Sequence, residues 1–351
     1  MPTLDDPRTQ TTRAIYAWRE AQEAAQPPRQ YLGASIIGHA CERYLWLTFR
    51  LAGRERFDGR MLRLFDRGQR EEATFVAELR GMGCQVHDVD ANGQQFGVEA
   101  HGGHFRGHMD GAVLGLPEAP ATWHVLEFKT HSAKSFKDLQ AKGVMAAKPM
   151  HYAQVQTYMH LTGMSRALYL AVNKDNDEIY QERIEHHAEH AQALINRAER
   201  AIFAPEPPPL LSNDPAWFEC KWCHFHGHCH GTAAPAVNCR TCAHSTPERD
   251  GTWACERHGH SLNFSAQQAG CPDHRHFPQL LANWAELTDA NAEANWVKYR
   301  NTLTGHAFAN AEGGQNDYSS AAITGCEDKA RIGELILNTA SMPILESEIP
   351  F

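Results

Sequence analysis

An acid and an amine stand two residues apart in the segment LEFKT, residues 126–130. If this segment is a β-strand, its side chains alternate between the two faces of a sheet. Glu127 and Lys129 then point to one face. Leu126 and Phe128 point to the other face, into apolar packing. A carboxylate can bind a divalent metal ion, and an amine can orient a water molecule or stabilise charge on a phosphate oxygen. The pair is therefore a candidate for hydrolytic chemistry at phosphate.

A second acid, Asp110, lies upstream in the segment GHMDG and has glycine close by on both sides. The segment between Asp110 and the E-x-K pair contains the loop GLPEAPAT, which is long enough to return the chain as an antiparallel strand. Asp110 and Glu127 can then share one metal ion. An E-x-K triplet alone is common by chance, and a solvent-facing ion pair on an edge strand is the alternative.

The hydrophobic periodicity predicts the elements that position these side chains. Helices are expected at residues 8–25, at 35–52 with Ser35 as N-cap, and at 60–81, 146–163 and 186–203. Strands are expected at residues 84–90, 94–101, 104–115, 122–130, 166–174 and 177–184. This order predicts an α/β (α+β) fold with a mixed central sheet flanked by helices.

Two further motifs frame the candidate pair in sequence. Gly68-x-x-x-Glu72 precedes it on an expected helix, and Gln154-x-x-x-Tyr158 follows it with both side chains on one helix face. The ordered set resembles the RecB-like branch of the PD-(D/E)XK nucleases, which includes phage-type and CRISPR-associated exonucleases. The resemblance covers roughly residues 30–230 and implies a restriction-endonuclease-like core.

The resemblance also implies roles for individual residues. The helix acid falls on Glu72, with Glu71 as the alternative, and the catalytic lysine falls on Lys129. Mg²⁺ or Mn²⁺ would be held by Asp110, Glu127 and the Phe128 carbonyl, because hard oxygen ligands suit such ions. Gln154 and Tyr158 complete the catalytic set. Many RecB-like nucleases have histidine where Glu72 stands, and the glutamate looks more like the phage exonuclease variants.

A first group of cysteines, Cys220, Cys223 and Cys229, offers three soft ligands within ten residues. Some RecB-like nucleases bind a [4Fe–4S] cluster with one cysteine before the core and three after it. In this sequence the early cysteine would be Cys41, in the segment CERYLW. Zinc is the alternative, with one histidine of residues 224–230 as fourth ligand.

A second group of cysteines begins with Cys239-x-x-Cys242 and continues with Cys255 and Cys271. This spacing indicates a structural zinc site in a small zinc-ribbon-like appendage. Three histidines compete for one ligand position: His244, His258 and His274.

The segment PEPPPLLSNDP (205–215) interrupts the pattern of helices and strands. Four parts are expected in the chain: an N-terminal helix in residues 1–30, a RecB-like nuclease domain in 31–232 closed by a cysteine cluster, a zinc-binding Cys-rich module in 233–278, and an acidic C-terminal extension in 279–351. A helix is expected at residues 279–299 of this extension.

Composition limits the classes of protein that fit. The chain has 351 residues, 42% of them apolar, and no apolar run near the roughly 20 residues that cross a bilayer. The polar N-terminus shows no secretory signal, so a cytoplasmic location is expected, where ten reduced cysteines favour metal over disulfides. A net charge of −9 argues against non-specific coating of DNA. An arginine-rich stretch, residues 43–70, is either a solvated helix face or a local DNA-contacting surface.

These features lead to one main hypothesis and two alternatives. The main hypothesis is a metal-dependent DNA exonuclease that resects linear duplex ends or digests single strands in phage-type recombination or replication. A single-strand annealing protein would be its partner by analogy. The alternatives are a CRISPR-adaptation-type nuclease and a catalytically silent module that binds DNA or protein on the same fold.

Overall fold

The computed structural model describes residues 9–334, which fall into two compact units. The first unit comprises the described residues up to Leu45 together with Arg54–Phe203. The second comprises Trp46–Gly53 and the described residues from Ala204 onward. The boundary after Phe203 coincides with the start of the proline-rich segment. The four parts expected from the sequence form a finer division and stay a prediction.

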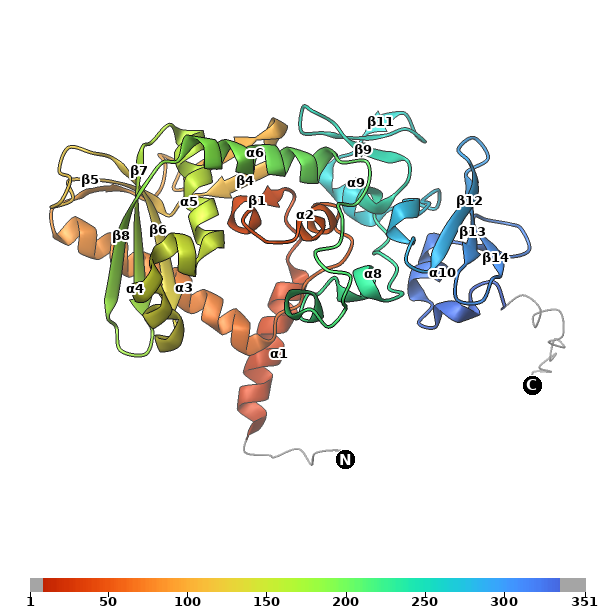
Figure 1. Cartoon of the computed structure of the whole chain (residues 1–351), viewed down its shortest axis with the longest axis horizontal. Helices are drawn as coiled ribbons and strands as arrows, with labels where there is room; N and C mark the ends of the chain where they lie inside the picture. Colours follow the sequence, from red (N-terminus) through yellow and green to blue (C-terminus); the bar gives the residue numbers. More distant parts are fainter. Residues whose placement is uncertain (1–8, 335–351) are drawn as a thin grey trace, which may run out of the picture. The chain divides into compact units, whose positions relative to one another are not determined.

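A five-stranded mixed sheet forms the centre of the first unit (Figure 1). Its spatial order is β2-β5-β6-β7-β8, in which only β6 and β7 are parallel. The antiparallel return between β5 and β6 is the one that the sequence predicts. The strand bounds are β2 Gln85–His87, β5 Gly111–Leu114, β6 His124–His131, β7 Arg166–Asn173 and β8 Ile179–Glu185.

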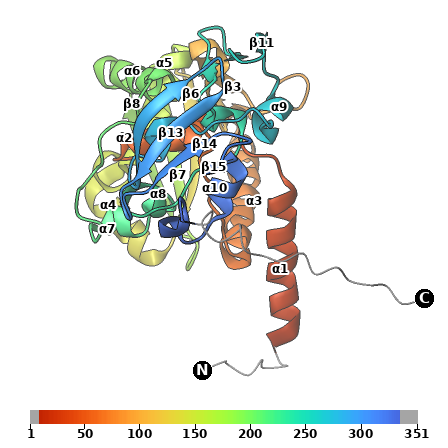
Figure 2. The ribbon, with the colours of Figure 1, turned by 90° about the vertical axis from the view of Figure 1, so that its right-hand side faces the viewer.

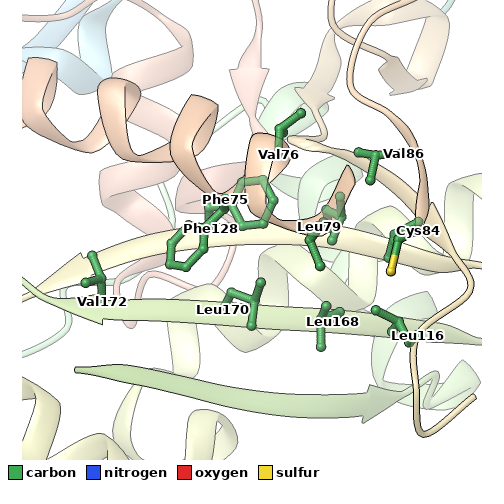
Figure 3. Packing of buried hydrophobic residues seen from close by; sticks show 12 residues of the cluster. Phe75, Val76, Leu79, Cys84, Val86, Leu116, Phe128, Leu168, Leu170 and Val172 are labelled. Atoms are coloured by element: carbon green, nitrogen blue, oxygen red, sulfur yellow. The ribbon is translucent and has the colours of Figure 1, made fainter. Parts of the chain in front are cut away.

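Helices cover both faces of this sheet. On one face lies α3 (Gly59–Gly81), whose Phe75 stacks on Phe128 of β6 with ring centroids 5.2 Å apart. Figure 3 shows Phe75, Leu79 and Leu170 within the resulting apolar core. Helices α4 (Ala133–Ala147) and α5 (Pro149–Thr162) cover the other face and supply the crossover that a parallel pair requires. The mixed α/β fold expected from the sequence is thus present.

Helix α5 is buried almost all round. Every residue from Ala153 to Met159 is buried, because the helix packs on the sheet and also against η2 (Ala34–Ile36) and α6 (Ala188–Phe203). Pro149 stands in its first turn, and Gly163 ends it in a left-handed conformation. This helix was expected at residues 146–163, whereas α4 was not predicted. A break at Gly143, where φ is 72°, interrupts the helical pattern within α4.

The helix expected at residues 35–52 is wrong in its first half. Leu32–Gly33 forms strand β1, which pairs with β4 (Phe105–His108), and α2 begins only at Glu42 and ends at Phe49. Ser35 therefore caps no α-helix. Within this stretch Gly38 lies close to α5, since a Cβ there would lie 2.8 Å from the Met150 Cα. Strand β3 (Gly97–Ala100) completes this small sheet, in the order β1-β4-β3. Helix α1 (Gln10–Ala25) packs against α3.

The second unit carries the cysteine-rich segment and a four-stranded sheet. Its short elements are α7 Phe218–Lys221, α8 His226–His230, β9 Ser245–Pro247, β10 Trp253–Cys255, β11 His260–Ser261, α9 Phe264–Ala269 and α10 Ser320–Gly325. The buried Arg240 joins two distant segments of this unit, because it donates to the Phe49 carbonyl at 2.9 Å and to the Gln267 side chain at 2.9 Å.

The helix expected at residues 279–299 is wrong, because β12 (Ala285–Asn291) and β13 (Trp296–Asn301) form a hairpin there. In β13 the buried Val297 and Tyr299 alternate with exposed residues, which is the period of a strand. Alanine and glutamate in this segment favour a helix locally, but burial of Val297 and Tyr299 decides for the strand. With β14 (Ala307–Asn310) and β15 (Asp317–Tyr318) the hairpin makes the blue sheet of Figure 2.

No helix within residues 9–334 combines the length and the apolar character that crossing a membrane requires.

Candidate active site

Asp110 lies where two strands of the central sheet separate. Gly111 pairs with Leu126, and the preceding Asp110 leaves the ladder. Its Oδ2 accepts a hydrogen bond of 2.7 Å from the Phe128 backbone N–H, so the carboxylate takes the place of a strand partner. Gly111 has a φ of 147°, and a Cβ there would lie 2.6 Å from the His87 carbonyl oxygen. Only glycine adopts this departure without strain.

Glu127 and Lys129 project from the face of β6 that α5 covers. The Glu127 side chain is fully buried, and the Lys129 ammonium donates to Glu127 Oε1. Lys129 Nζ also donates to the Phe128 carbonyl at 3.1 Å. Glu127 Oε2 is buried and has no hydrogen-bond partner in the described structure. A buried carboxylate oxygen without a partner is costly, which marks it as a candidate ligand atom.

Glu72 approaches the same place from α3. It is three residues before Phe75, so it lies on the helix face that packs on the sheet. Burial raises the pKa of Glu72 to about 7, and the charge of Asp110 adds to the rise while Lys129 opposes it. These mutual effects tie Glu72 to Asp110 and Lys129. The structure therefore brings the helix acid, the aspartate and the E-x-K pair together.

The charges at this place are unbalanced. Burial raises the pKa of Glu127 to about 8, and Asp110 adds to the rise while Lys129 partly offsets it. The pKa of Asp110 is also raised, chiefly by burial. Burial by itself would lower the pKa of Lys129, but Glu127, Asp110 and Glu72 together hold it above the usual value. Three carboxylates thus face one ammonium, and a divalent cation would relieve the excess negative charge.

Gln154 and Tyr158 line the site from α5. Gln154 Nε2 donates to the Tyr158 hydroxyl at 3.0 Å, and both side chains are buried. Burial raises the pKa of Tyr158, and the charge of Glu127 contributes to the rise. Gly107 makes room for the tyrosine ring, since a Cβ at this position would lie 2.5 Å from Tyr158 Cε1. The positive charge of Arg29 opposes this rise in the pKa of Tyr158.

The residues present suit a hard divalent cation. Asp110, Glu127 and the Phe128 carbonyl offer oxygen ligands, and Glu127 Oε2 is an orphaned oxygen among them. Within residues 9–334 no three His, Cys, Asp or Glu side chains already stand at metal-binding positions. At this site the Lys129 ammonium engages Glu127 Oε1 and Asp110 engages the Phe128 amide.

The sequence did not identify a group of polar residues beside Lys129. The Tyr169 hydroxyl on β7 lies 3.0 Å from His131 Nε2 and 2.8 Å from His151 Nδ1. The motifs of the sequence do not include His131. The alternation of β6 places His131 on the face of Glu127 and Lys129, which is the signal that could have selected it.

The four cysteines of the second group line one cavity of about 280 Å³. Burial and the three neighbouring thiols raise the pKa of Cys239 to about 11. Of the competing histidines, His274 Nε2 lies 3.0 Å from the Asn238 carbonyl oxygen and His244 Nε2 lies 2.8 Å from the Asn295 side-chain oxygen. His258 Nε2 lies 3.7 Å from Cys271 Sγ. The donor set is that of a structural zinc site, which stays a prediction.

The first cysteine group is divided between the two units. Cys220, Cys223 and Cys229 lie on or between the short helices α7 and α8 of the second unit. Cys41 belongs to the first unit, where its Sγ accepts from the Tyr44 N–H at 3.4 Å. Neither an iron–sulfur cluster nor zinc at this group is tested by the structure, so both stay predictions. All ten cysteines lie among the described residues, and none forms a disulfide.

The arginine-rich stretch has several different environments. Arg50 is 4% exposed, and its guanidinium lies 4.4 Å from the Trp46 ring centroid. Arg67 donates to the Lys174 carbonyl at 2.7 Å. Arg60, Arg63 and Arg70 are exposed on α3. The arginines of this stretch therefore do not all belong to one continuous basic face.

Comparison with known proteins gives weak structural similarity only. No protein-family profile and no curated protein matches the chain. A crystal structure of SSO0001 is similar with a TM-score of 0.38 and 16% identity over 64% of this chain and 97% of that chain. The alkaline exonuclease LHK-Exo from Laribacter hongkongensis is similar with a TM-score of 0.35 and 17% identity over 54% of this chain and 89% of that chain. Its complex with dAMP gives a TM-score of 0.35 at 15% identity, with the same coverage of both chains. Function must therefore be argued from the site itself.

Proposed function

We propose that the chain is a metal-dependent nuclease that hydrolyses phosphodiester bonds of DNA. The observation that carries this proposal is the convergence of Asp110, Glu127 and Glu72 around Lys129 where β5 leaves β6. A set of three acids and one amine in which Glu127 is fully buried and the other three are half-buried is an expensive arrangement. It is useful when a divalent cation and an anionic substrate complete it.

Asp110, Glu127 and the Phe128 carbonyl would hold Mg²⁺ or Mn²⁺. The ion supplies positive charge to the reacting phosphate and lowers the pKa of a bound water. Lys129 then contributes as a hydrogen-bond donor to the attacking water or to a phosphate oxygen, and Glu127 keeps its ammonium in place. Glu72, with a pKa near neutrality, can accept a proton from the water.

Gln154 and Tyr158 orient the substrate and exclude water from the α5 side. Their mutual hydrogen bond fixes both side chains, so one donor position of the Gln154 amide is used within the protein. The high pKa of Tyr158 keeps its hydroxyl protonated at neutral pH, so it can donate to a phosphate oxygen. We infer an exonuclease that acts on linear ends as the finer form of this function, with a single-strand annealing protein as its partner.

Digestion of three DNA forms tests this function. Linear duplex, circular duplex and single-stranded DNA are incubated with the protein and Mn²⁺ or Mg²⁺, with a chelator as control. Degradation of linear DNA alone supports the exonuclease. Cutting of circles supports an endonuclease on the same site. Absence of cleavage from every substrate overturns the proposal and leaves a binding module.

A further inference from the structure

A second polar cluster continues the line of site residues along β6. Ser135, on α4, lies 3.1 Å from His131 Nδ1 through its Oγ. Lys148, immediately before α5, donates from Nζ to Ser135 Oγ at 2.7 Å. Lys129 and His131 are two residues apart on one strand face, a step of about 6.7 Å. Through His131, the contacts of Ser135 and Lys148 therefore extend the row of polar residues on this strand face beyond Lys129.

Buried neighbours hold this cluster in place. His131 is 7% exposed, and its Nε2 lies 3.0 Å from the Tyr169 hydroxyl. The same hydroxyl lies 2.8 Å from His151 Nδ1 on α5. Both ring nitrogens of His131 are thus engaged, one by Tyr169 and the other by Ser135. A hydroxyl and an ammonium held by such contacts are preorganised for a ligand.

Three lysines act electrostatically on His131, and one of them, Lys148, belongs to the cluster. Burial, together with the charges of Lys148, Lys129 and Lys174, lowers the pKa of His131 to about 4, so the ring is neutral at pH 7. The nearby acids are committed elsewhere: Asp138 pairs with Lys142, and Asp175 accepts from the Ala133 N–H at 2.8 Å. Among residues 9–334 Lys148 has no carboxylate at ion-pair distance. An ammonium group without a carboxylate partner attracts an anion.

We propose that Lys148 and Ser135 form a subsite for a backbone phosphate of the nucleic acid next to the phosphate that reacts. Lysine binds phosphate as a point charge, and the serine hydroxyl can turn to donate a second hydrogen bond. The subsite would set the register of the strand, because it fixes one phosphate relative to Lys129. This inference rests on the proposed nuclease function and names how its substrate is held.

Replacement of the lysine tests the protein side of the subsite. Initial rates on end-labelled linear DNA should show a KM about tenfold higher for Lys148→Ala, with kcat within about twofold of the parent. The slope of log affinity against log salt should fall by about 0.9, the value for one lost contact to duplex DNA. Lys148→Arg should restore the KM. Lys142→Ala is the matched control, since Lys142 lies on α4 and pairs with Asp138 on the surface.

Neutralisation of single phosphates tests the DNA side with the unaltered protein. One methylphosphonate is placed in turn at each position flanking the cleaved bond. At one position it should raise the KM of the parent about tenfold and leave the KM of Lys148→Ala unchanged. Three results would overturn the subsite: an equal rise in KM for both proteins, no sensitive position in the parent, or the same KM for Lys148→Ala and Lys142→Ala. In each case cleavage of DNA by the parent would leave the nuclease function standing. A parent protein that cleaves no DNA overturns the function itself.

Discussion

Replacement of Gly111 by alanine should destabilise the first unit by about 3 kcal/mol. Gly111 has a φ of 147°, a conformation that costs a residue with a side chain roughly 1–3 kcal/mol. The added Cβ would lie 2.6 Å from the His87 carbonyl oxygen and 3.1 Å from the Asp88 Cα, both of which are backbone atoms. Because backbone cannot swing aside as a side chain does, β5 must move, and Asp110 must move with it. The Asp110 bond to the Phe128 N–H is therefore expected to lengthen.

Urea denaturation followed by circular dichroism measures this effect, with Gly68→Ala as the matched control. Gly68 lies inside α3 with open space around its Cα, so alanine there should stabilise the protein by about 0.5–1 kcal/mol. The two substitutions thus add the same atom and should change the free energy of unfolding in opposite directions. A Gly111→Ala protein within about 0.5 kcal/mol of the parent would refute the argument that glycine holds the strands apart at Asp110.

Three further predictions concern the core, the buried histidines and the cysteine cavity. Phe128→Ala should cost about 3–5 kcal/mol in urea denaturation, because its ring is buried on Phe75, whereas Ala at the exposed Phe65 should cost less than about 1 kcal/mol. Burial lowers the pKa of His151 to about 3, with a contribution from Lys129, so the folded protein holds this ring neutral. The free energy of unfolding is therefore unaffected by His151 above pH 6.5, and below pH 6.5 it should fall by about 1 kcal/mol per pH unit, because the unfolded chain binds a proton that the folded ring does not. The fall should be shallower in His151→Gln. Parallel pH profiles of the parent and His151→Gln would contradict the assignment. The purified parent protein should contain zinc, whereas Cys242→Ser should lack it and melt at a lower temperature. Metal analysis that finds no zinc in the parent would exclude the site.

Much of the first unit follows from local pattern. The alternation in β6 separates Leu126 and Phe128 from Glu127 and Lys129, and the structure has Phe128 in the core and Glu127 under α5. Residues 60–81 read correctly as a helix because Phe75, Val76 and Leu79 recur at helical spacing. A pattern of this kind predicts which face a residue takes. It therefore also groups Glu127 with Lys129.

What the sequence could not predict depends on contacts between distant segments. Residues 34–41 form no α-helix, and Gly38 among them lies against α5, a contact of which the helix pattern gives no sign. Alanine and glutamate in and before the hairpin of β12 and β13 favour a helix locally, and burial of Val297 and Tyr299 against the rest of the second unit overrides them. The pairing of Tyr169 with His131 and His151 likewise needs three elements in register.

Cleavage of end-labelled linear DNA by the parent protein and by Lys129→Ala tests the central claim most directly. The parent should cut only in the presence of Mg²⁺ or Mn²⁺. The variant should fold normally by circular dichroism but cut about a hundredfold or more slowly, because the donor that stabilises charge at the reacting phosphate is gone. Undiminished metal-dependent cleavage by folded Lys129→Ala would contradict the account, and so would a parent that cuts equally well in the presence of a chelator.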